Sequence, residues 1–217
     1  MKIAAWLSVA LLTFHFAAAA ELPSALATEP SGWKDVMPPV DLQSWSRVAI
    51  PPTNTLGRAQ WHVDGVRQVL ICDGDGGHEM LRFDHKLTNS IFHVEFRFIP
   101  LLEKHPHYNS GVFIRNSADG MIWHQCQLTS DGGYLFGNTP VKGVPESFMV
   151  QAETRCWKSA TNWNAVEFTA RGTTLSVWFN GAALSELDHC EMPSGYLALE
   201  SEGYAIEFRN LKLKELP

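Results

Sequence analysis

Short runs of alternating hydrophobic and polar residues recur along most of the chain. The clearest run, IFHVEFRF at residues 91–98, has a period of two, which is typical of a β-strand. It places one set of side chains on one face (Phe92, Val94, Phe96 and Phe98) and a second set on the other (His93, Glu95 and Arg97). No segment shows the apolar spacing of a convincing amphipathic helix. The pattern therefore predicts an all-β protein.

Turn residues separate these runs at short intervals. Asp64-Gly65, Arg171-Gly172, Asn180-Gly181 and Glu202-Gly203 each lie between two runs and are typical of tight turns. Many short strands joined in this way favour a β-sandwich or jelly roll with antiparallel sheets. The chain has no internal repeat, low-complexity tract or linker, so we expect one domain over residues 32–217.

The first twenty residues follow a different pattern. Lys2 precedes an apolar run that ends in small residues, Ala18-Ala19-Ala20, directly before Glu21. This layout predicts a cleaved signal peptide at residues 1–20, with an uncleaved membrane anchor as the alternative. Residues 21–31 are expected to form a flexible lead-in. The prediction is an exported protein, periplasmic or extracellular, with no membrane span after cleavage.

Charge and cysteine content narrow the classes of function. The formal net charge is −6, with no run of like charges, which argues against a nucleic-acid or anionic-membrane partner. Export permits one or two disulfides, and four cysteines allow three pairings. No pair has the C-x-x-C spacing of a zinc or redox site, so we expect structural or unpaired cysteines. The four are Cys72, Cys126, Cys156 and Cys190.

The stretch YNSGVFIRNSADGMIWHQCQL, residues 108–128, predicts two strands joined by a polar turn. One face of the pair carries Asn109, Phe113 and Arg115 on its first strand, and Trp123, Gln125 and Gln127 on its second. His124 has the opposite parity, which favours a core or edge position, although we keep it as a candidate ligand contact. In the closing strand, Glu200 and Glu202 share a face with Ala198.

These faces suggest a carbohydrate site. If the strands carrying Glu95, Arg115 and Glu200 lie in one sheet, then acids, an arginine, amides and a tryptophan line one surface. Sugar hydroxyls need such donors and acceptors, and an aromatic ring packs on the C–H face of a sugar. The alternative is an ordinary solvated sheet face, with Arg115 and Glu95 as a cross-strand ion pair.

A glycine-rich segment, GDGGHEML at residues 74–81, adds two further candidates. This segment could bring His78 and Glu79 to the rim of the site, where they would act as a base or contact the ligand. The alternative is a simple glycine-rich hairpin loop. No nucleophile elbow, phosphate-binding loop or H-E-x-x-H metal motif is present.

Taken together, these residues resemble the bacterial 3-keto-disaccharide (3-keto-glycoside) hydrolase domain family, formerly domain of unknown function 1080. The resemblance covers about residues 32–216, and its most specific parts are NSGVFIR and EFRNLKLKEL. It implies a concanavalin-like jelly roll. Asn109, Arg115, Gln127 and Glu95 match the family pattern.

Two departures from that pattern fall on the proposed site. The family commonly has E-V-Q where this chain has Gln125-Cys126-Gln127. It commonly has L-Q-x-H-G where this chain has Leu199-Glu200-Ser201-Glu202-Gly203. An acid has become an amide, and an amide and a histidine have become acids. Either the acidic function has moved across the cleft, or the activity is altered or lost.

The resemblance implies a specific chemistry. A ketone at C3 of a glucosyl unit acidifies the C2 proton, so a base can remove it and the glycosidic oxygen can then leave by elimination, before water adds. The implied roles are Glu200 or Glu202 as base or acid, Arg115 as enolate clamp and Glu95 orienting Arg115. Asn109, Gln125 and Gln127 hold hydroxyls and Trp123 stacks.

We expect no cofactor, although a divalent metal could take over the role of the arginine. The expected partner is a carbohydrate, an oxidised disaccharide or glycoside. The same jelly roll also serves lectins, so the alternative is a non-catalytic carbohydrate-binding domain of the cell envelope.

Overall fold

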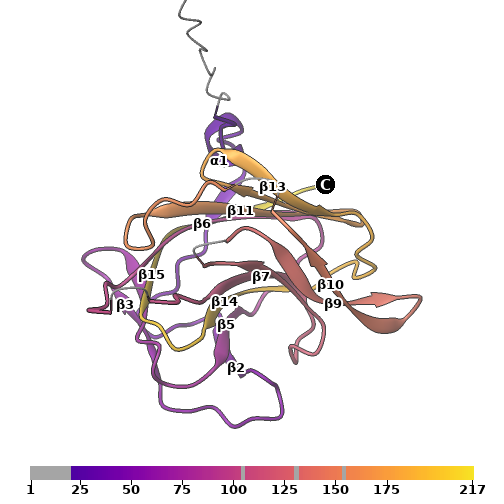
Figure 1. The fold of residues 1–217 in the computed structure, drawn as a ribbon. Coiled ribbons are helices and arrows are strands. Elements are labelled where there is room, and N and C mark those ends of the chain that lie inside the picture. Colours follow the sequence, from indigo (N-terminus) through magenta and orange to yellow (C-terminus); the bar gives the residue numbers. More distant parts are fainter. Residues whose placement is uncertain (1–20, 104–105, 130–131, 153–154) are drawn as a thin grey trace, which may run out of the picture.

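Two antiparallel sheets stacked face to face make up most of the protein (Figure 1). The structure is a computed structural model, and it describes residues 21–103, 106–129, 132–152 and 155–217. Within these residues the strands form an eight-stranded and a seven-stranded sheet. The predicted signal peptide lies outside the described residues. In the described ranges, no helix has the length and apolarity needed to cross a bilayer.

Both sheets combine strands that are distant in sequence. The eight-stranded sheet contains, in spatial order, β13 (Ala182–Leu187), β12 (Thr174–Phe179), β11 (Asn164–Arg171), β6 (Ser90–Phe98), β15 (Ile206–Glu215), β4 (Val69–Cys72) and β3 (Trp61–Asp64), with β1 (Trp33–Asp35) also paired to β15. The seven-stranded sheet contains β10 (Val144–Val150), β9 (Leu135–Val141), β8 (Trp123–Gln127), β7 (Gly111–Asn116), β14 (Tyr196–Ser201), β5 (Glu79–Phe83) and β2 (Trp45–Ala49).

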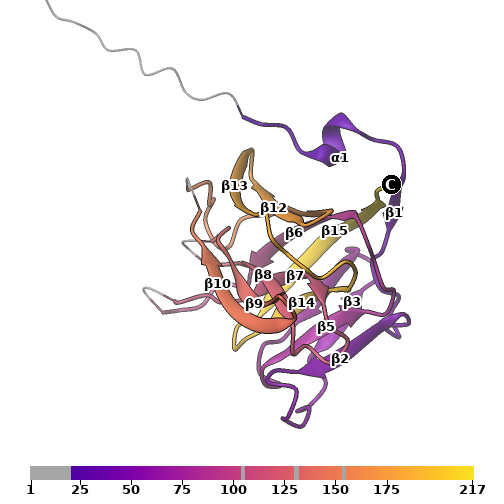
Figure 2. The same cartoon turned by 90° about the vertical axis from the view of Figure 1, so that its right-hand side faces the viewer.

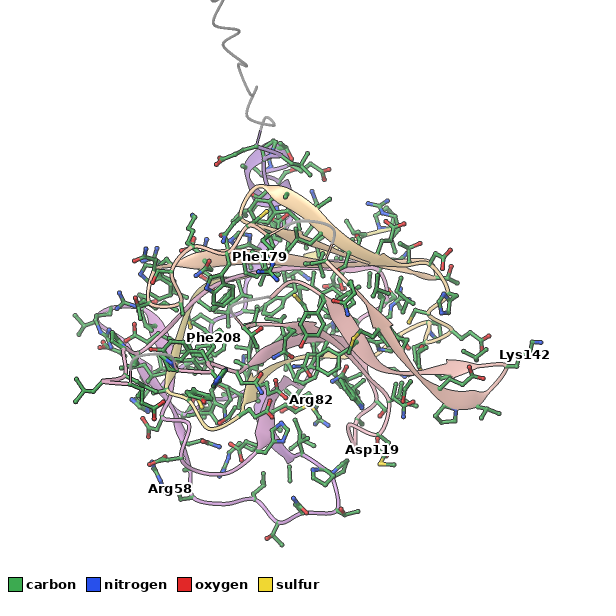
Figure 3. The ribbon with its side chains drawn as sticks, viewed as in Figure 1. Arg58, Arg82, Asp119, Lys142, Phe179 and Phe208 are labelled. Atoms are coloured by element: carbon green, nitrogen blue, oxygen red, sulfur yellow. The ribbon has the colours of Figure 1, made fainter. Side chains whose placement is uncertain are left out.

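The core fills the space between the sheets, because alternate residues of each strand point inward. The phenylalanines of β6 are fully buried there, as the alternation predicts. Figure 3 shows Phe179 and Phe208 within the body of the protein, whereas Lys142 lies at the tip of the projecting β9–β10 hairpin. The predicted all-β jelly roll and its tight turns are confirmed; Asn180 and Gly181, for example, both have the positive φ of a hairpin turn.

The strands that carry the candidate residues divide between the two sheets. β5, β7, β8 and β14 lie in the seven-stranded sheet, in the order β8-β7-β14-β5. β6 lies in the other sheet, between β11 and β15, so Glu95 points outward on the opposite side of the sandwich. There Glu95 accepts hydrogen bonds from Arg209 Nε at 2.7 Å and Asn210 Nδ2 at 3.0 Å. The expectation that Glu95 orients Arg115, or pairs with it, is therefore wrong.

Residues 21–31, for which we expected a flexible lead-in, contact the outer face of the eight-stranded sheet. They include a short helix, α1 (Ala25–Thr28), which lies above the sheet that contains β12, β6 and β15 (Figure 2). The carboxylate of Glu167 accepts hydrogen bonds from Ala25 N at 2.7 Å and Leu26 N at 3.0 Å, which satisfies two donors of the helix start. Trp178 Nε1 donates to the Leu22 carbonyl at 2.7 Å.

All four cysteines lie in the described part of the chain, and none forms a disulfide. Cys72, Cys126 and Cys190 are buried, where they pack as small apolar residues. The four cysteines are thus unpaired, which is one of the two states expected from the sequence.

Candidate functional site

A cavity of about 560 Å³ lies on the face of the seven-stranded sheet that points away from the other sheet. Parity explains its floor: Val112, Cys126 and Leu199 point into the core, so their neighbours along β7, β8 and β14 point outward. The lining residues from the sheet and its flanking loops are Ile50, Pro51, Pro52, His78, Met80, Asn109, Phe113, Asn116, Gly120, Met121, Trp123, Gln125, Gln127, Tyr134, Phe136, Asn138, Glu200 and Glu202.

A chain of carboxamides joins β14, β8 and the segment before β7 across the cavity floor. Gln125 Nε2 on β8 donates to Glu200 Oε2 on β14 at 2.7 Å and to Gln127 Oε1 at 3.0 Å. Gln127 Nε2 in turn donates to Asn109 Oδ1. β7 lies between β8 and β14, so the Gln125 side chain must pass over it, and it does so at Gly111. A Cβ atom at Gly111 would lie 2.3 Å from Gln125 Nε2.

His78, Glu200 and Glu202 form a titratable cluster at one end of this chain. His78 precedes β5, and its Nε2 lies 2.9 Å from Glu200 Oε1 and 4.0 Å from Glu202 Oε2. Glu200 is buried, while His78 and Glu202 are both partly exposed. We call this region, with Asn109 and Gln127, the polar end of the cavity.

Burial and neighbours shift the pKa of two of these groups. Burial raises the pKa of the Glu200 carboxyl above its usual range, and the negative charge of Glu202 raises it further; hydrogen bonds from His78 and Gln125 oppose both effects. The hydrogen bond to Glu200 raises the pKa of His78, although partial burial opposes it. A buried carboxyl with a raised pKa beside a histidine is typical of acid–base sites.

The same three groups are close enough to share a divalent cation. One ligand atom from each of His78, Glu200 and Glu202 lies within 4.8 Å of the others. Imidazole nitrogen and carboxylate oxygens are common ligands of such ions. The sequence analysis did not identify this set, because it joins a loop to a distant strand. The expectation that the protein needs no cofactor stays a prediction.

Aromatic and aliphatic side chains line the other end of the cavity, which we call the apolar end. Phe113 packs edge-on against Trp123, with ring centroids 6.4 Å apart, and Trp123 packs edge-on against Phe136 at 5.1 Å. Phe113, Met80 and Ala198 form a small apolar cluster separate from the core between the sheets. Trp123 is half-buried and lines the cavity, as its parity predicts.

Arg115 lies outside the cavity, contrary to expectation. It has a positive φ of 54° and forms a bulge, in which Ile114 and Arg115 together oppose Leu197 of β14. The bulge shifts the parity by one residue, so Asn116 takes the place on the cavity wall. The buried guanidinium instead donates to the carbonyls of Gly172 at 2.6 Å and Met192 at 2.8 Å, and to Asn89 Oδ1 at 3.1 Å.

Glu79 and His124 also point away from the cavity. Glu79 is buried on the inner side of β5, where Arg47 donates to both its oxygens at 2.8 and 2.7 Å and Trp61 Nε1 donates at 2.8 Å. His124 is fully buried, and its Nε2 lies 2.9 Å from Thr139 Oγ1. Burial lowers the pKa of His124 to about 4. The parity argument for His124 is confirmed, and its candidacy as a ligand contact is wrong.

The fold places the protein in a recognisable structural class. A candidate glycosyl hydrolase from Parabacteroides distasonis has a TM-score of 0.60 at 14% identity, over 92% of this chain and 100% of that one. The carbohydrate-binding module CBM66 of Bacillus subtilis has a TM-score of 0.58 at 9% identity, over 79% of this chain and 96% of that one. The β-glucanase of Bacillus licheniformis has a TM-score of 0.51 at 10% identity, over 80% of this chain and 92% of that one. The class is the jelly-roll sandwich that occurs in glucanases and carbohydrate-binding modules.

The sequence assigns the protein to a family within this structural class. The chain belongs to the family of 3-keto-alpha-glucoside-1,2-lyase-like domains, which matches residues 32–214. This confirms the resemblance seen in the sequence. No curated protein matches the chain.

The two departures from the family pattern lie in contact. Gln125 stands where the family commonly has an acid, Glu200 stands where it commonly has an amide, and the two side chains share the 2.7 Å hydrogen bond. In this chain the carboxylate of the pair is therefore on β14 and the carboxamide on β8. Glu202, which belongs to the same departure as Glu200, lies 4.0 Å from His78, so the cluster contains an imidazole.

Proposed function

We propose that this protein cleaves 3-keto-glycosides by removing the C2 proton, eliminating the glycosidic oxygen and then adding water. One observation carries the proposal: an imidazole and two carboxylates converge within 4.8 Å beside a chain of carboxamides in one cavity. Such a cavity offers an acid–base pair together with partners for sugar hydroxyls. The family to which the chain belongs supports the same chemistry.

Each step of the proposed reaction has a group to serve it. Glu200, as the carboxylate, takes the proton from C2, and the electron pair moves onto the C3 oxygen as an enolate. The enolate collapses to form the C1=C2 bond, which expels the glycosidic oxygen from C1. Glu202 or a water protonates the leaving oxygen. Addition of water to C1, with return of a proton to C2, completes net hydrolysis.

His78 replaces Arg115 in this scheme. The guanidinium of Arg115 is bound to backbone carbonyls outside the cavity, so it is not available to an enolate. The raised pKa of His78 favours its cationic form at the polar end, where positive charge stabilises developing negative charge on the C3 oxygen.

The direct test is turnover of 3-keto-trehalose and of methyl 3-keto-glucosides, followed by NMR. Wild type is expected to release the leaving alcohol or sugar and to exchange the C2 proton for deuterium in D₂O. Glu200→Gln is expected to lower kcat/KM by about 10²–10⁴-fold. Glu186→Gln, at an exposed position on β13, is the matched control and is expected to leave the rate unchanged. Absence of both release and exchange would overturn the proposal. A parallel assay with a chelator tests whether a divalent ion is required.

A second candidate function is carbohydrate binding without turnover. Both oxygens of Glu200 already accept hydrogen bonds, from His78 and Gln125, which is also the arrangement of a carboxylate with a fixed structural role. Saturable sugar binding by wild type, with neither alcohol release nor C2 exchange, would favour this function.

Export through the predicted signal peptide is part of the proposal. N-terminal sequencing of the protein from the periplasmic or culture fraction is expected to begin at Glu21. A full-length chain that begins at Met1 would contradict it.

A further inference from the structure

The cavity-lining residues of β7, β8, β14 and the start of β5 change from apolar to polar in the same spatial direction; Arg82, the next outward residue of β5, does not line the cavity. The antiparallel registers give these changes the same direction but stagger them from strand to strand, since Phe113 lies opposite Gln125 and Met80 lies opposite Glu200. Successive outward residues on one strand are roughly 7 Å apart. The changes run from Phe113 to Asn109 on β7 and its lead-in, from Trp123 to Gln127 on β8, from Ala198 to Glu202 on β14 and its turn, and from Met80 to His78 at β5. The cavity therefore suits a ligand with one polar and one apolar part.

The apolar end has the form of a box for a flat ring. Phe113 and Phe136 each stand edge-on to Trp123, at interplanar angles of 80° and 88°. Met121, in the turn after β7, closes another side and is 56% exposed. Apolar surface gathered in a cavity beside polar groups is typical of a ligand site.

Each of the two amides that border this end, Asn116 and Asn138, has one group engaged with the backbone. Asn116 Oδ1 accepts from His124 N at 3.0 Å, and Asn138 Nδ2 donates to the Met121 carbonyl at 3.4 Å. Of the described lining residues, the charged ones all lie at the polar end. A second sugar ring would need partners for its hydroxyls, because buried polar groups without them are costly. An aromatic ring needs only edge and face contacts.

We propose that the apolar end binds an aromatic aglycone, so that the favoured substrates are 3-keto-glycosides of aromatic alcohols. This inference rests on the proposed function and names its leaving-group subsite. The oxidised sugar lies over Glu200 and the carboxamide chain, and the ring beyond the glycosidic oxygen lies between Phe113, Trp123 and Met121.

The test compares benzyl and methyl 3-keto-glucosides, in both anomers, with 3-keto-trehalose. Benzyl alcohol and methanol are similarly poor leaving groups, so a difference in kcat/KM reports binding of the ring. Burying the ring is expected to raise kcat/KM for the benzyl compound by about tenfold or more. A ratio near one in wild type, or a preference for 3-keto-trehalose over the benzyl compound, would overturn the inference.

Two exposed methionines provide a matched pair of variants. Met121→Ala removes one wall of the box and is expected to lower the benzyl-to-methyl ratio several-fold. Met149→Ala, 60% exposed on β10 and not among the cavity residues, is expected to leave the ratio unchanged. Phe113→Leu changes the floor of the box and is likewise expected to lower the benzyl-to-methyl ratio. An unchanged ratio in both Met121→Ala and Phe113→Leu would contradict the inference.

Binding of the unoxidised glucosides separates this inference from the proposed function. Calorimetry is expected to show that benzyl glucoside binds more tightly than methyl glucoside, and that Met121→Ala removes the difference. If that holds while no 3-keto-glycoside is turned over, the aromatic subsite stands and the proposed function fails. If turnover is seen without any benzyl preference, the proposed function stands and this inference fails.

Discussion

Gln125 and Glu200 share a 2.7 Å hydrogen bond although a strand, β7, lies between the strands that carry them. The bond is possible because Gly111 leaves the surface of β7 open beneath the Gln125 side chain. The chemistry proposed for Glu200 thus depends on the absence of a side chain at a neighbouring position.

Gly111→Ala is expected to displace Gln125. The new Cβ would lie 2.3 Å from Gln125 Nε2, so the hydrogen bond to Glu200 is lost. Because that bond lowers the pKa of Glu200, the pKa is expected to rise, and kcat/KM to fall by up to about a hundredfold, as misplaced catalytic groups cause. Steady-state kinetics on a methyl 3-keto-glucoside measure the effect, and Gly65→Ala in the β3–β4 turn is the control. An unchanged rate would mean that the bond has no role in catalysis.

Exchanging the two side chains tests whether the pair works as a unit. Glu200→Gln alone leaves two amides, and Gln125→Glu alone places two carboxylates in contact, which raises the pKa of one of them. Both single variants are expected to be impaired, Glu200→Gln by about 10²–10⁴-fold. The double variant restores one acid and one amide and is expected to recover to within about tenfold of wild type, by the logic of a double-mutant cycle. A double variant as inactive as Glu200→Gln would show that the acid must stand on β14.

Replacing His78 or Glu202 by the uncharged glutamine is expected to move the acid limb of the pH profile of kcat/KM, in opposite directions for the two variants. His78 lowers the pKa of Glu200 and Glu202 raises it. His78→Gln should therefore move the limb to higher pH, and Glu202→Gln to lower pH, provided that Glu200 acts as the carboxylate. The profile of residual activity, or carbon NMR of labelled glutamate, measures the shifts. If the acid limb moved in the same direction in both variants, Glu200 would be excluded as the titrating group.

The raised pKa of Glu200 also has a consequence for stability. The folded state holds this proton more tightly than the unfolded state does, so the free energy of unfolding is expected to decrease as pH rises from the ordinary carboxyl range through the pKa of the folded state. Glu200→Gln should remove this decrease. Urea unfolding at several pH values measures it, and an unaltered pH dependence in the variant would contradict the assignment.

Arg115→Met is expected to affect stability and not chemistry. The substitution leaves the carbonyls of Gly172 and Met192 without their buried donor, at a cost of about 2–4 kcal/mol in the free energy of unfolding. The kcat/KM of the folded fraction should stay within about threefold of wild type, because the guanidinium lies outside the cavity. Denaturant unfolding and kinetics on the same sample measure both, with Arg171→Met as an exposed control. If Arg115→Met lost activity while its free energy of unfolding stayed unchanged, Arg115 would have a role in the reaction after all.

Side-chain parity was the part of the site that the sequence could predict. Gln125, Gln127 and Glu200 line the cavity because strict alternation holds along β8 and β14. Parity gives the face of a strand but not its sheet, and for this reason Glu95 was misplaced. The pairing of β14 with β7 joins segments about eighty residues apart, and no local pattern encodes it.

Arg115 shows a second limit. The alternation of β7 runs without interruption in the sequence, yet one residue with positive φ breaks it in the structure. A non-glycine residue in that conformation leaves no reliable sequence signal. The apolar end was likewise only partly predictable, because Phe136 comes from β9, outside residues 108–128, and Met121 lies in the turn of that stretch and not on one of its two strands.

The contact of α1 with Glu167 determines how the protein can be attached to anything larger. The amino-terminal segment lies on the outer face of the eight-stranded sheet (Figure 2). The cavity opens from the outer face of the other sheet. A polypeptide fused ahead of residue 21 would therefore leave the sandwich on the side opposite the cavity. Immobilisation through that end should leave the binding face turned toward the solution.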